Sequence, residues 1–367
     1  MALQCGIVGL PNVGKSTTFN ALTRGKALAA NYPFATKDPN VGVITVPDHR
    51  LDKLAELVKP QRVVPTTVEI VDIAGLIKGA SKGEGLGNQF LANIREVDAI
   101  VHVIRCFEDD NVVHVDGSVN PVRDKEIIDY ELALKDLETL EKRIDKTSRA
   151  AKAGNKDELR DLEILNRVKA HLESGNPVRQ LLPEMDEDGK RLLKELSLLT
   201  GKPVLYVCNV DESAVNTGNA HTAALAKSIE GEDAEVLMLC ANIEAQIADM
   251  ETEDERREFL DMMGLDESGA GKLIRACYKL LHLITYFTAG EKEVRAWTVR
   301  LGAKAPEAAG VIHSDFEKGF IRAEVIKYND FIAFGSEAKV KEAGKMAVEG
   351  KEYVVHDGDI MHFRFNV

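Results

Sequence analysis

A glycine-rich segment, GLPNVGKST at Gly9–Thr17, directly follows the short apolar run Leu3–Val8. It matches the pattern GxxxxGK[ST] and stands where a strand would pass into a helix. Gly9 and Gly14 let the backbone curl so that its amide groups point inward at phosphate oxygens. The segment therefore predicts a phosphate-binding loop in an α/β sheet. A glycine-rich turn that matches by chance is the alternative, and the strand before the motif argues against it.

Metal and phosphate ligands follow from the order of the next residues. Lys15 is expected to bridge the β- and γ-phosphates, and the Ser16 hydroxyl to bind Mg²⁺. Thr36 lies in the polar loop NYPFAT, where a switch threonine would complete the Mg²⁺ shell. An exposed threonine carries no meaning alone, so this prediction depends on its order and spacing behind the loop.

A DxxG motif ends the predicted strand Thr67–Ile73. Asp72 can hold Mg²⁺ through water, and the Gly75 amide can sense the γ-phosphate. A strand-end Asp before Gly is also common in ordinary turns, so the phosphate-binding loop gives the motif its weight. The glycine-rich stretch Leu76–Asn88 that follows predicts a second switch, ordered when the γ-phosphate is present.

Short β-branched runs alternate with helical patterns through the first hundred residues and again after residue 200. This rhythm is typical of an α/β sheet with crossover helices. The predicted strands are Leu3–Val8, Val41–Val46, Thr67–Ile73, Ala99–Arg105, Pro203–Asn209 and Glu235–Ala241, with an amphipathic helix at Gly271–Leu283.

Charged helical sequence interrupts this rhythm between residues 122 and 200. Apolar residues three and four apart form one stripe on each of two helices. The turn Ala153-Gly154-Asn155 between them predicts an antiparallel helical hairpin. The stripes comprise Tyr130, Leu134, Leu137, Leu140 and Ile144, then Leu159, Leu162, Leu165, Val168 and Leu172.

The last part of the chain has short alternating runs punctuated by Gly and Pro, which predicts a small β-rich domain. We therefore expect a nucleotide-binding domain at 1–281, interrupted by the helical insertion 122–200, and a second domain at 282–367. The predicted strands of the second domain are Glu293–Leu301, Phe320–Ile326, Phe331–Phe334, Tyr353–Val355 and Ile360–Phe365.

The base-reading motif departs from that of GTPases. They read guanine with NKxD after a late strand, whereas this chain has Asn209-Val210-Asp211-Glu212. Val210 replaces the lysine, and the extra methylene of Glu212 would misplace the carboxylate that accepts from guanine. Adenine has neither of those donors. The motif predicts that ATP is preferred to GTP.

At this point the chain resembles the YchF/Obg-like ATPase family. The segments GLPNVGKST, NYPFAT, DIAGLIKGASKGEGLGNQFL, NVDE and GVIHSDFEKGFIRAEVI all look like signatures of that family. The resemblance covers essentially the whole length. It implies an α/β P-loop NTPase of the Ras-like G-domain type, an inserted helical hairpin, a C-terminal β-grasp TGS domain, and hydrolysis of ATP.

The resemblance also implies roles for individual residues. It assigns phosphate binding to the loop residues Asn12, Val13, Gly14, Lys15, Ser16 and Thr17, Mg²⁺ binding to Ser16 and Thr36, and adenine binding to Asn209 and Val210, to which we add Glu212. The segment Cys240-Ala241-Asn242 stands where GTPases have a SAK-like motif and departs from it.

The group that positions the attacking water is not the usual one. Ras-like enzymes use a Gln after DxxG, and this chain has Leu76, which cannot hydrogen-bond. Slow intrinsic hydrolysis is therefore expected. His114, in a loop after a strand, could swing toward the γ-phosphate, although most loop histidines are only surface residues. His102 inside an apolar run reads as a core residue. Asn12 resembles the asparagine of K⁺-stimulated relatives, or is a simple turn residue.

Composition constrains the partners. The net charge of −13 argues against a protein that coats nucleic acid. Nine basic against five acidic residues between Lys142 and Lys169 nevertheless make the hairpin tip basic, which suits structured RNA or the ribosome as well as an ordinary solvated helix.

The five cysteines are scattered and form no CxxC pair, so we expect them to be buried thiols. Without a leader or an apolar span, we expect a cytoplasmic monomer that binds neither DNA nor membranes.

Three functions remain open from the sequence: a slow ATP-driven switch on the ribosome, a P-loop kinase of a small acceptor, and an RNA-binding scaffold with structural nucleotide. The DxxG motif and two flexible switches favour the first. A kinase would need an acceptor pocket and a lid, for which the sequence has no signature.

Overall fold

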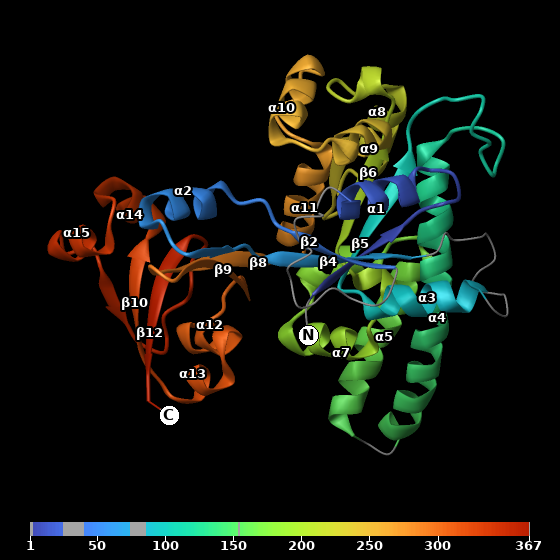
Figure 1. Ribbon diagram of the computed structural model, residues 1–367. Helices are drawn as coiled ribbons and strands as arrows, with labels where there is room; N and C mark the ends of the chain where they lie inside the picture. Colours follow the sequence, from blue (N-terminus) through green and yellow to red (C-terminus); the bar gives the residue numbers. More distant parts are fainter. Residues whose placement is uncertain (1–2, 25–39, 74–85, 153–154, 367) are drawn as a thin grey trace. The chain divides into compact units, whose positions relative to one another are not determined.

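The computed structural model describes residues 3–24, 40–73, 86–152 and 155–366 (Figure 1). The chain forms two compact units. Unit 1 comprises Met1–Val43 and Glu69–Leu273, and unit 2 comprises Ile44–Val68 and Ile274–Val367. Among the described residues, no helix combines the length and the apolar character needed to cross a bilayer.

Unit 1 is built on a six-stranded sheet of order β2-β4-β1-β5-β6-β7. The strands from β4 to β7 are parallel, and every residue of β5 and β6 is buried, as expected for central strands covered on both faces. All six strands predicted from the sequence are confirmed to within two residues. Their bounds are β1 (Gln4–Val8), β2 (Val41–Thr45), β4 (Thr67–Asp72), β5 (Ala99–Arg105), β6 (Val204–Asn209) and β7 (Glu235–Leu239).

Helices surround this sheet, and two of them begin at capping boxes. Asn219 and Thr252 each start a helix with a capping box. The buried carboxylate of Glu244 accepts hydrogen bonds from the Gly269 and Ala270 amides at the start of another. The helices are α1 (Lys15–Arg24), α3 (Leu86–Glu96), α8 (Ala220–Ser228), α9 (Ala241–Asp249) and α10 (Glu253–Met262), with a 3₁₀ turn η4 at Glu212–Ala214. The boundary between the two units falls within α11 (Gly269–Leu280).

The predicted hairpin is present as α4 (Pro121–Ala151) and α5 (Lys156–Glu173), which lie side by side in Figure 1. Leu140 and Leu165 are fully buried between them. Tyr130 and Leu159, which we placed in the apolar stripes, are instead 60% and 51% exposed. Shorter elements complete the arm's core: α6 (Val178–Leu181), α7 (Glu187–Leu196) and the 3₁₀ turns η2 (Leu182–Glu184) and η3 (Leu199–Gly201).

A buried network of ion pairs connects the N-terminal part of α4 and the helix α6 to the sheet. Lys125 of α4 lies 2.8 Å from Glu232, and Arg179 of α6 lies 2.6 Å from the same carboxylate. The Arg179 guanidinium also donates to the Tyr206 hydroxyl of β6 at 3.0 Å. Burial, with the nearby charges of Lys125 and Arg179, lowers the pKa of His102 to about 3. His102 is therefore a neutral core residue, as predicted.

Unit 2 is a second six-stranded sheet, of order β11-β10-β12-β8-β9-β3, with mixed strand directions. Helices α12 and α13 pack on one face, and α2, α14 and α15 on the other. The elements are α2 (His49–Val58), β3 (Arg62–Val64), β8 (Leu283–Ala289), β9 (Glu293–Arg300), α12 (Ala305–Ile312), α13 (Ser314–Lys318), β10 (Phe320–Lys327), α14 (Tyr328–Phe334), α15 (Glu337–Glu342), β11 (Ala347–Glu349) and β12 (Asp359–Phe365).

Two strands predicted for this unit are wrong. Phe331–Phe334 lies in the helix α14, because Tyr328, Phe331 and Phe334 share one apolar helix face and Gly335 ends the helix with φ 74°. Tyr353–Val355 contributes only an isolated bridge from Lys304 to Val354.

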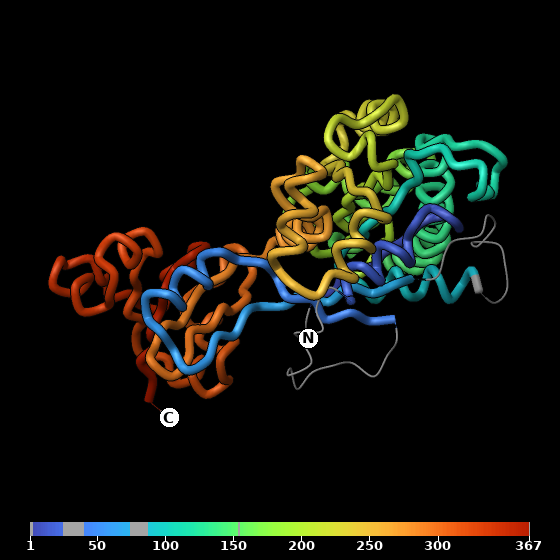
Figure 2. The backbone as a smooth tube through the Cα atoms, turned by 45° about the horizontal axis from the view of Figure 1, so that its top comes forward, coloured from blue at the N-terminus to red at the C-terminus, as the bar shows by residue number. Residues whose placement is uncertain are grey.

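Residues 44–68 belong with the second sheet, although they lie far from it in sequence. Leu51 and Leu54 of α2 pack against Phe287 in one core of unit 2, and β3 pairs with β9. Figure 2 shows this blue segment among the orange and red elements. We retain 1–281 and 282–367 as proposed domain limits, whereas the compact unit around the second sheet also takes in this excursion.

Candidate functional site

The phosphate-binding loop joins β1 to α1 at the edge of the sheet where the parallel strands end. Asn12 has φ 63° and Gly14 has φ 92°, so the loop passes twice through the left-handed region. A Cβ on Gly9 would lie 2.6 Å from the Val103 carbonyl oxygen, and one on Gly14 would collide with the Asn209 amide. Both glycines are therefore required by the fold of the loop.

Lys15 and Asp72, predicted to bind phosphate and Mg²⁺, lie together beside this loop. The Lys15 ammonium forms a hydrogen-bonded ion pair with the Asp72 carboxylate, and the two side chains are 11% and 19% exposed. Ser16 and Thr17 are exposed on the first turn of α1. Carboxylate and hydroxyl oxygens are ligands that Mg²⁺ prefers. These residues fit a phosphate-bound cation.

Thr36 and Gly75 lie outside the described residues, and so does Leu76. Their predicted roles toward Mg²⁺, the γ-phosphate and the attacking water stay predictions.

Asn209 holds the loop in place from the end of β6. Its amide nitrogen donates to the Val13 carbonyl at 2.9 Å, and its amide oxygen accepts from the Ala241 amide at 2.9 Å. Asn209 is 4% exposed, and Val13 is 1% exposed. One side chain thus joins the phosphate-binding loop, β6 and the start of α9.

The rest of the base-reading motif divides into buried and exposed residues. Val210 is 2% exposed, and its amide donates to the Leu239 carbonyl. Cys240, in the segment that replaces SAK, is also buried. Glu212 is exposed in the turn η4. Of the three residues predicted to contact the base, Asn209, Val210 and Glu212, the last is the one whose side chain reaches the surface.

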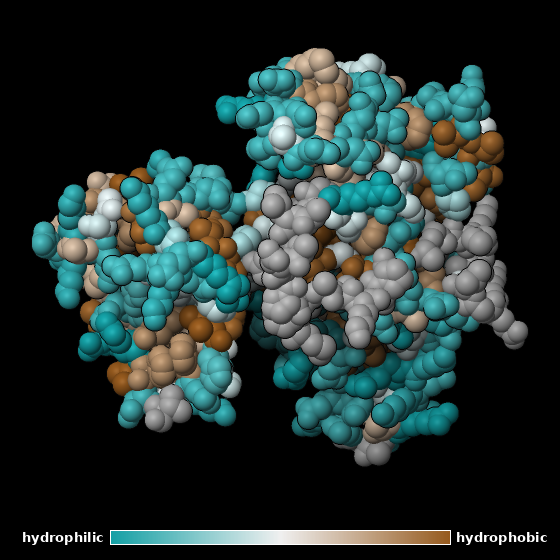
Figure 3. All heavy atoms as spheres, in the orientation of Figure 1, coloured by the Kyte–Doolittle hydropathy of each residue, from teal (hydrophilic) through white to brown (hydrophobic). Residues whose placement is uncertain are grey.

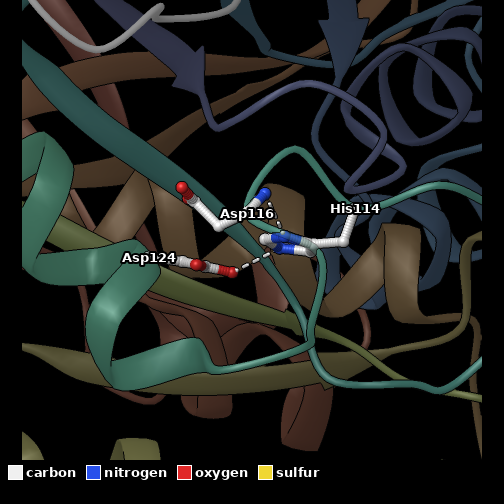
Figure 4. Close-up of side chains that lie close together, drawn as sticks. All are labelled: His114, Asp116 and Asp124. Carbon is white, nitrogen blue, oxygen red and sulfur yellow. Dashed lines mark hydrogen bonds and ion pairs between the residues drawn. The ribbon is translucent and has the colours of Figure 1, made fainter.

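His114 is buried, and its ring points toward Asp124 in the first turn of α4 (Figure 4). Its Nε2 lies 2.8 Å from the Asp124 carboxylate, and its Nδ1 accepts from the Asp116 amide at 3.1 Å. The alternative of an ordinary surface histidine is wrong, because the residue is 7% exposed and Asp124 gives the ring a buried partner. The predicted role of His114 toward the attacking water stays a prediction. Arg123 pairs with the other oxygen of Asp124 at 2.9 Å, so both carboxylate oxygens have partners within the fold and we assign no metal to this cluster.

The loop that carries His114 is tied to the phosphate-binding loop. The Asn12 amide donates to the Val113 carbonyl at 3.0 Å. The buried Arg105 guanidinium, at the end of β5, donates to the carbonyls of Phe107, Asp109 and Val112. Sequence reasoning missed Arg105 and Asp124. A charged residue that closes an apolar strand was the available signal for Arg105.

Two family models match the chain. YchF-GTPase_C, described as "Protein of unknown function (DUF933)", matches residues 283–366. MMR_HSR1, described as "50S ribosome-binding GTPase", matches residues 4–144.

Curated relatives match over the full length. "Ribosome-binding ATPase YchF" of Bacillus subtilis (strain 168) is 58% identical over 369 residues, covering 100% of both chains. The protein of the same name from Pasteurella multocida (strain Pm70) is 55% identical over 367 residues, again covering 100% of both. The solved structure titled "Structure of the Schizosaccharomyces pombe YchF GTPase" is 40% identical, with a TM-score of 0.90, and the match covers 99% of this chain and 97% of that one.

Proposed function

This chain belongs to the YchF family, and from that premise we propose that it is a ribosome-binding ATPase that acts as a slow, nucleotide-dependent switch. The family resemblance and the α/β P-loop fold are confirmed by the comparisons. The activity is carried to this chain from relatives that it matches from end to end.

The observation that carries the proposal is the Lys15–Asp72 ion pair beside a complete phosphate-binding loop. In a nucleotide complex both groups would exchange this partner. Lys15 would hold the phosphates, and Asp72 with Ser16 would hold Mg²⁺. Bound Mg²⁺ supplies positive charge where negative charge develops on the transferred phosphoryl group. The exposed first turn of α1 offers its amides to the same phosphates.

ATP rather than GTP is the proposed substrate, with weaker GTP hydrolysis. The buried Val210 cannot take the place of the lysine of NKxD, and Glu212 presents its carboxylate one methylene further out than an aspartate. The Asn209 side chain is occupied by the loop and α9, so its contribution to the base site is indirect in this conformation.

K⁺ activation through Asn12 belongs to the proposal as well. The amide nitrogen of Asn12 is bound to the Val113 carbonyl, which leaves its amide oxygen as the atom that a cation would use.

Ribosomal RNA is the proposed partner of the hairpin tip. The ion pairs within the hairpin indicate which of its basic residues are available to contact RNA. Five of its nine basic residues pair with carboxylates within the arm, whereas four near the turn have no ion-pair partner among the described residues. The paired residues are Lys142, Arg143, Arg160, Arg167 and Lys169, and the others are Lys146, Arg149, Lys152 and Lys156. We further propose a cytoplasmic monomer that binds neither DNA nor membranes.

Multiple-turnover hydrolysis without an added acceptor tests the function. The wild-type chain should release phosphate from ATP slowly in Mg²⁺, bind ATP more tightly than GTP, and co-sediment with ribosomes. Phosphate transfer only in the presence of a small acceptor would support a kinase instead. Tight nucleotide binding without turnover would support a scaffold. A clear preference for GTP would contradict the argument from Val210 and Glu212.

A further inference from the structure

The loop after β5 exposes two large apolar side chains at the rim of the nucleotide site. Val113 is 73% exposed and Val115 is 52% exposed. In the space-filling view, hydrophobic atoms gather over this loop (Figure 3). Because each valine flanks the buried His114, the two side chains point outward while the residue between them points inward.

This exposure is not the result of a loosely held loop. Arg105, 2% exposed, binds three carbonyls of the segment between Phe107 and Val112. The His114–Asp124 contact anchors the loop at α4, and Asn12 anchors it at the phosphate-binding loop. Three separate sets of polar contacts thus maintain a backbone that keeps both valines in solvent.

The charges around the valines are acidic. Glu108, Asp109, Asp110 and Asp116 are all exposed in the same loop. Glu108 contacts His221, and Asp116 lies 3.9 Å from Arg123, while Asp109 binds the neighbouring Asn111. The exposed carboxylates repel the negative charges of a phosphodiester backbone and attract a basic protein surface. The two valines can then contact an apolar side chain on that surface.

We propose that residues 108–116 are a docking surface for a basic ribosomal protein, and that docking there stimulates ATP hydrolysis. The proposal rests on the proposed function and names a partner for the same site. The loop shares a hydrogen bond with the phosphate-binding loop and carries His114, so a partner that shifts its backbone acts directly on both. Such a partner would supply the acceleration that a chain without the usual glutamine lacks. This surface is distinct in sign from the basic hairpin tip, which we assign to RNA.

The test compares ATP turnover alone with turnover in the presence of intact ribosomes, for the full chain. Val115→Ser and Asp110→Lys change the surface without touching the anchoring contacts. We expect each to keep its basal rate and to lower the ratio of stimulated to basal turnover by about tenfold, as loss of a central interface contact does. Val348→Ser, at another exposed valine, and Asp261→Lys, at another exposed aspartate, are the matched controls and should retain the wild-type ratio.

The outcomes separate the two proposals. Absence of basal hydrolysis in the wild-type chain would defeat the proposed function itself. With basal hydrolysis present, failure of ribosomes to stimulate the wild type, or equal stimulation of both surface variants, would overturn the docking surface. Protein-stripped ribosomal RNA should not stimulate turnover. If it stimulates as well as intact ribosomes, the partner is RNA and the inference is wrong.

Discussion

The two sides of the proposed nucleotide site are built differently. On the phosphate side, Lys15 and Asp72 hold each other, and Ser16 and Thr17 face solvent. On the base side, Asn209 and Val210 are buried and hydrogen-bonded to the fold. A ligand can replace the contacts on the first side, whereas those on the second also hold the sheet, the loop and α9 together.

Because of this difference, substitutions on the two sides should affect different properties, namely ATP turnover and the stability of the fold. A change at Lys15 or Ser16 should remove turnover and leave unfolding unaffected, and a change at the buried Asn209 or Val210 should do the reverse. Lys15 and Ser16 are expected to be required for the atoms that they offer to phosphate and Mg²⁺, whereas Asn209 of the base motif is also required by packing.

Lys15→Ala should have the largest effect on turnover, because it removes the positive charge expected at the transferred phosphate. We expect kcat for ATP to fall about 10³-fold. The melting temperature should change little, since Asp72 retains access to water. Lys190→Ala, which removes an exposed lysine paired with Glu187, is the control and should leave kcat unchanged. Unchanged turnover in Lys15→Ala would place the nucleotide site elsewhere.

His114→Ala tests a residue that is proposed to take part in hydrolysis and that is also buried against Asp124. If the ring leaves Asp124 and positions water during turnover, kcat should fall about 10²-fold with little change in ATP affinity. If it serves only as a buried partner of Asp124, the melting temperature should fall while kcat remains.

The same experiment is repeated with the monovalent cation varied. Assays of His114→Ala and Asn12→Ala in K⁺ and in Na⁺ separate water positioning from K⁺ activation. Turnover that depends steeply on K⁺ and survives loss of the histidine would assign the acceleration to the cation at Asn12. An unaltered kcat in His114→Ala would remove the histidine from the mechanism.

The sequence was sufficient wherever a local pattern determines structure. The strands of unit 1 and the phosphate-binding loop follow from periodicity and from glycine positions. It was insufficient where a partner lies outside any local pattern. Asp124 is ten residues from His114 across an irregular loop, Val13 is 196 residues from Asn209, and residues 44–68 join the second sheet. The apolar run Phe331–Phe334 is too short for periodicity to distinguish a strand from a helix. Burial of Phe331 in the core of unit 2, with Tyr328 packed on the same cluster, is consistent with the helix α14 that is observed.

Asn209→Ala should destabilise unit 1 more than it affects chemistry. The change removes two buried hydrogen bonds and leaves the Val13 carbonyl and the Ala241 amide without them. We expect the free energy of unfolding to fall by about 2 kcal/mol, measured by denaturant titration. Asn12→Gly is the matched control, because it removes an exposed asparagine with one bond and keeps the left-handed backbone. Equal stability of Asn209→Ala and the wild type would show that the base side is not structural.

Glu212→Asp should give the smallest effect, and it addresses the exposed part of the base side. The change restores the aspartate of NKxD at a surface position, so the fold should tolerate it. With Val210 unchanged, only one of the two guanine-reading features returns. We therefore expect the ratio of ATP to GTP affinity to shift toward GTP by about tenfold at most, which is the value of one hydrogen bond. Glu212→Ala, which removes the carboxylate, separates a gained guanine contact from a lost adenine one. Val210→Lys, in contrast, places a charge at a side chain that is 2% exposed, and it should lower the melting temperature before it changes nucleotide preference. If Val210→Lys instead folds normally and selects GTP, the base side opens more readily than its buried contacts imply, and the contrast between the two sides is wrong.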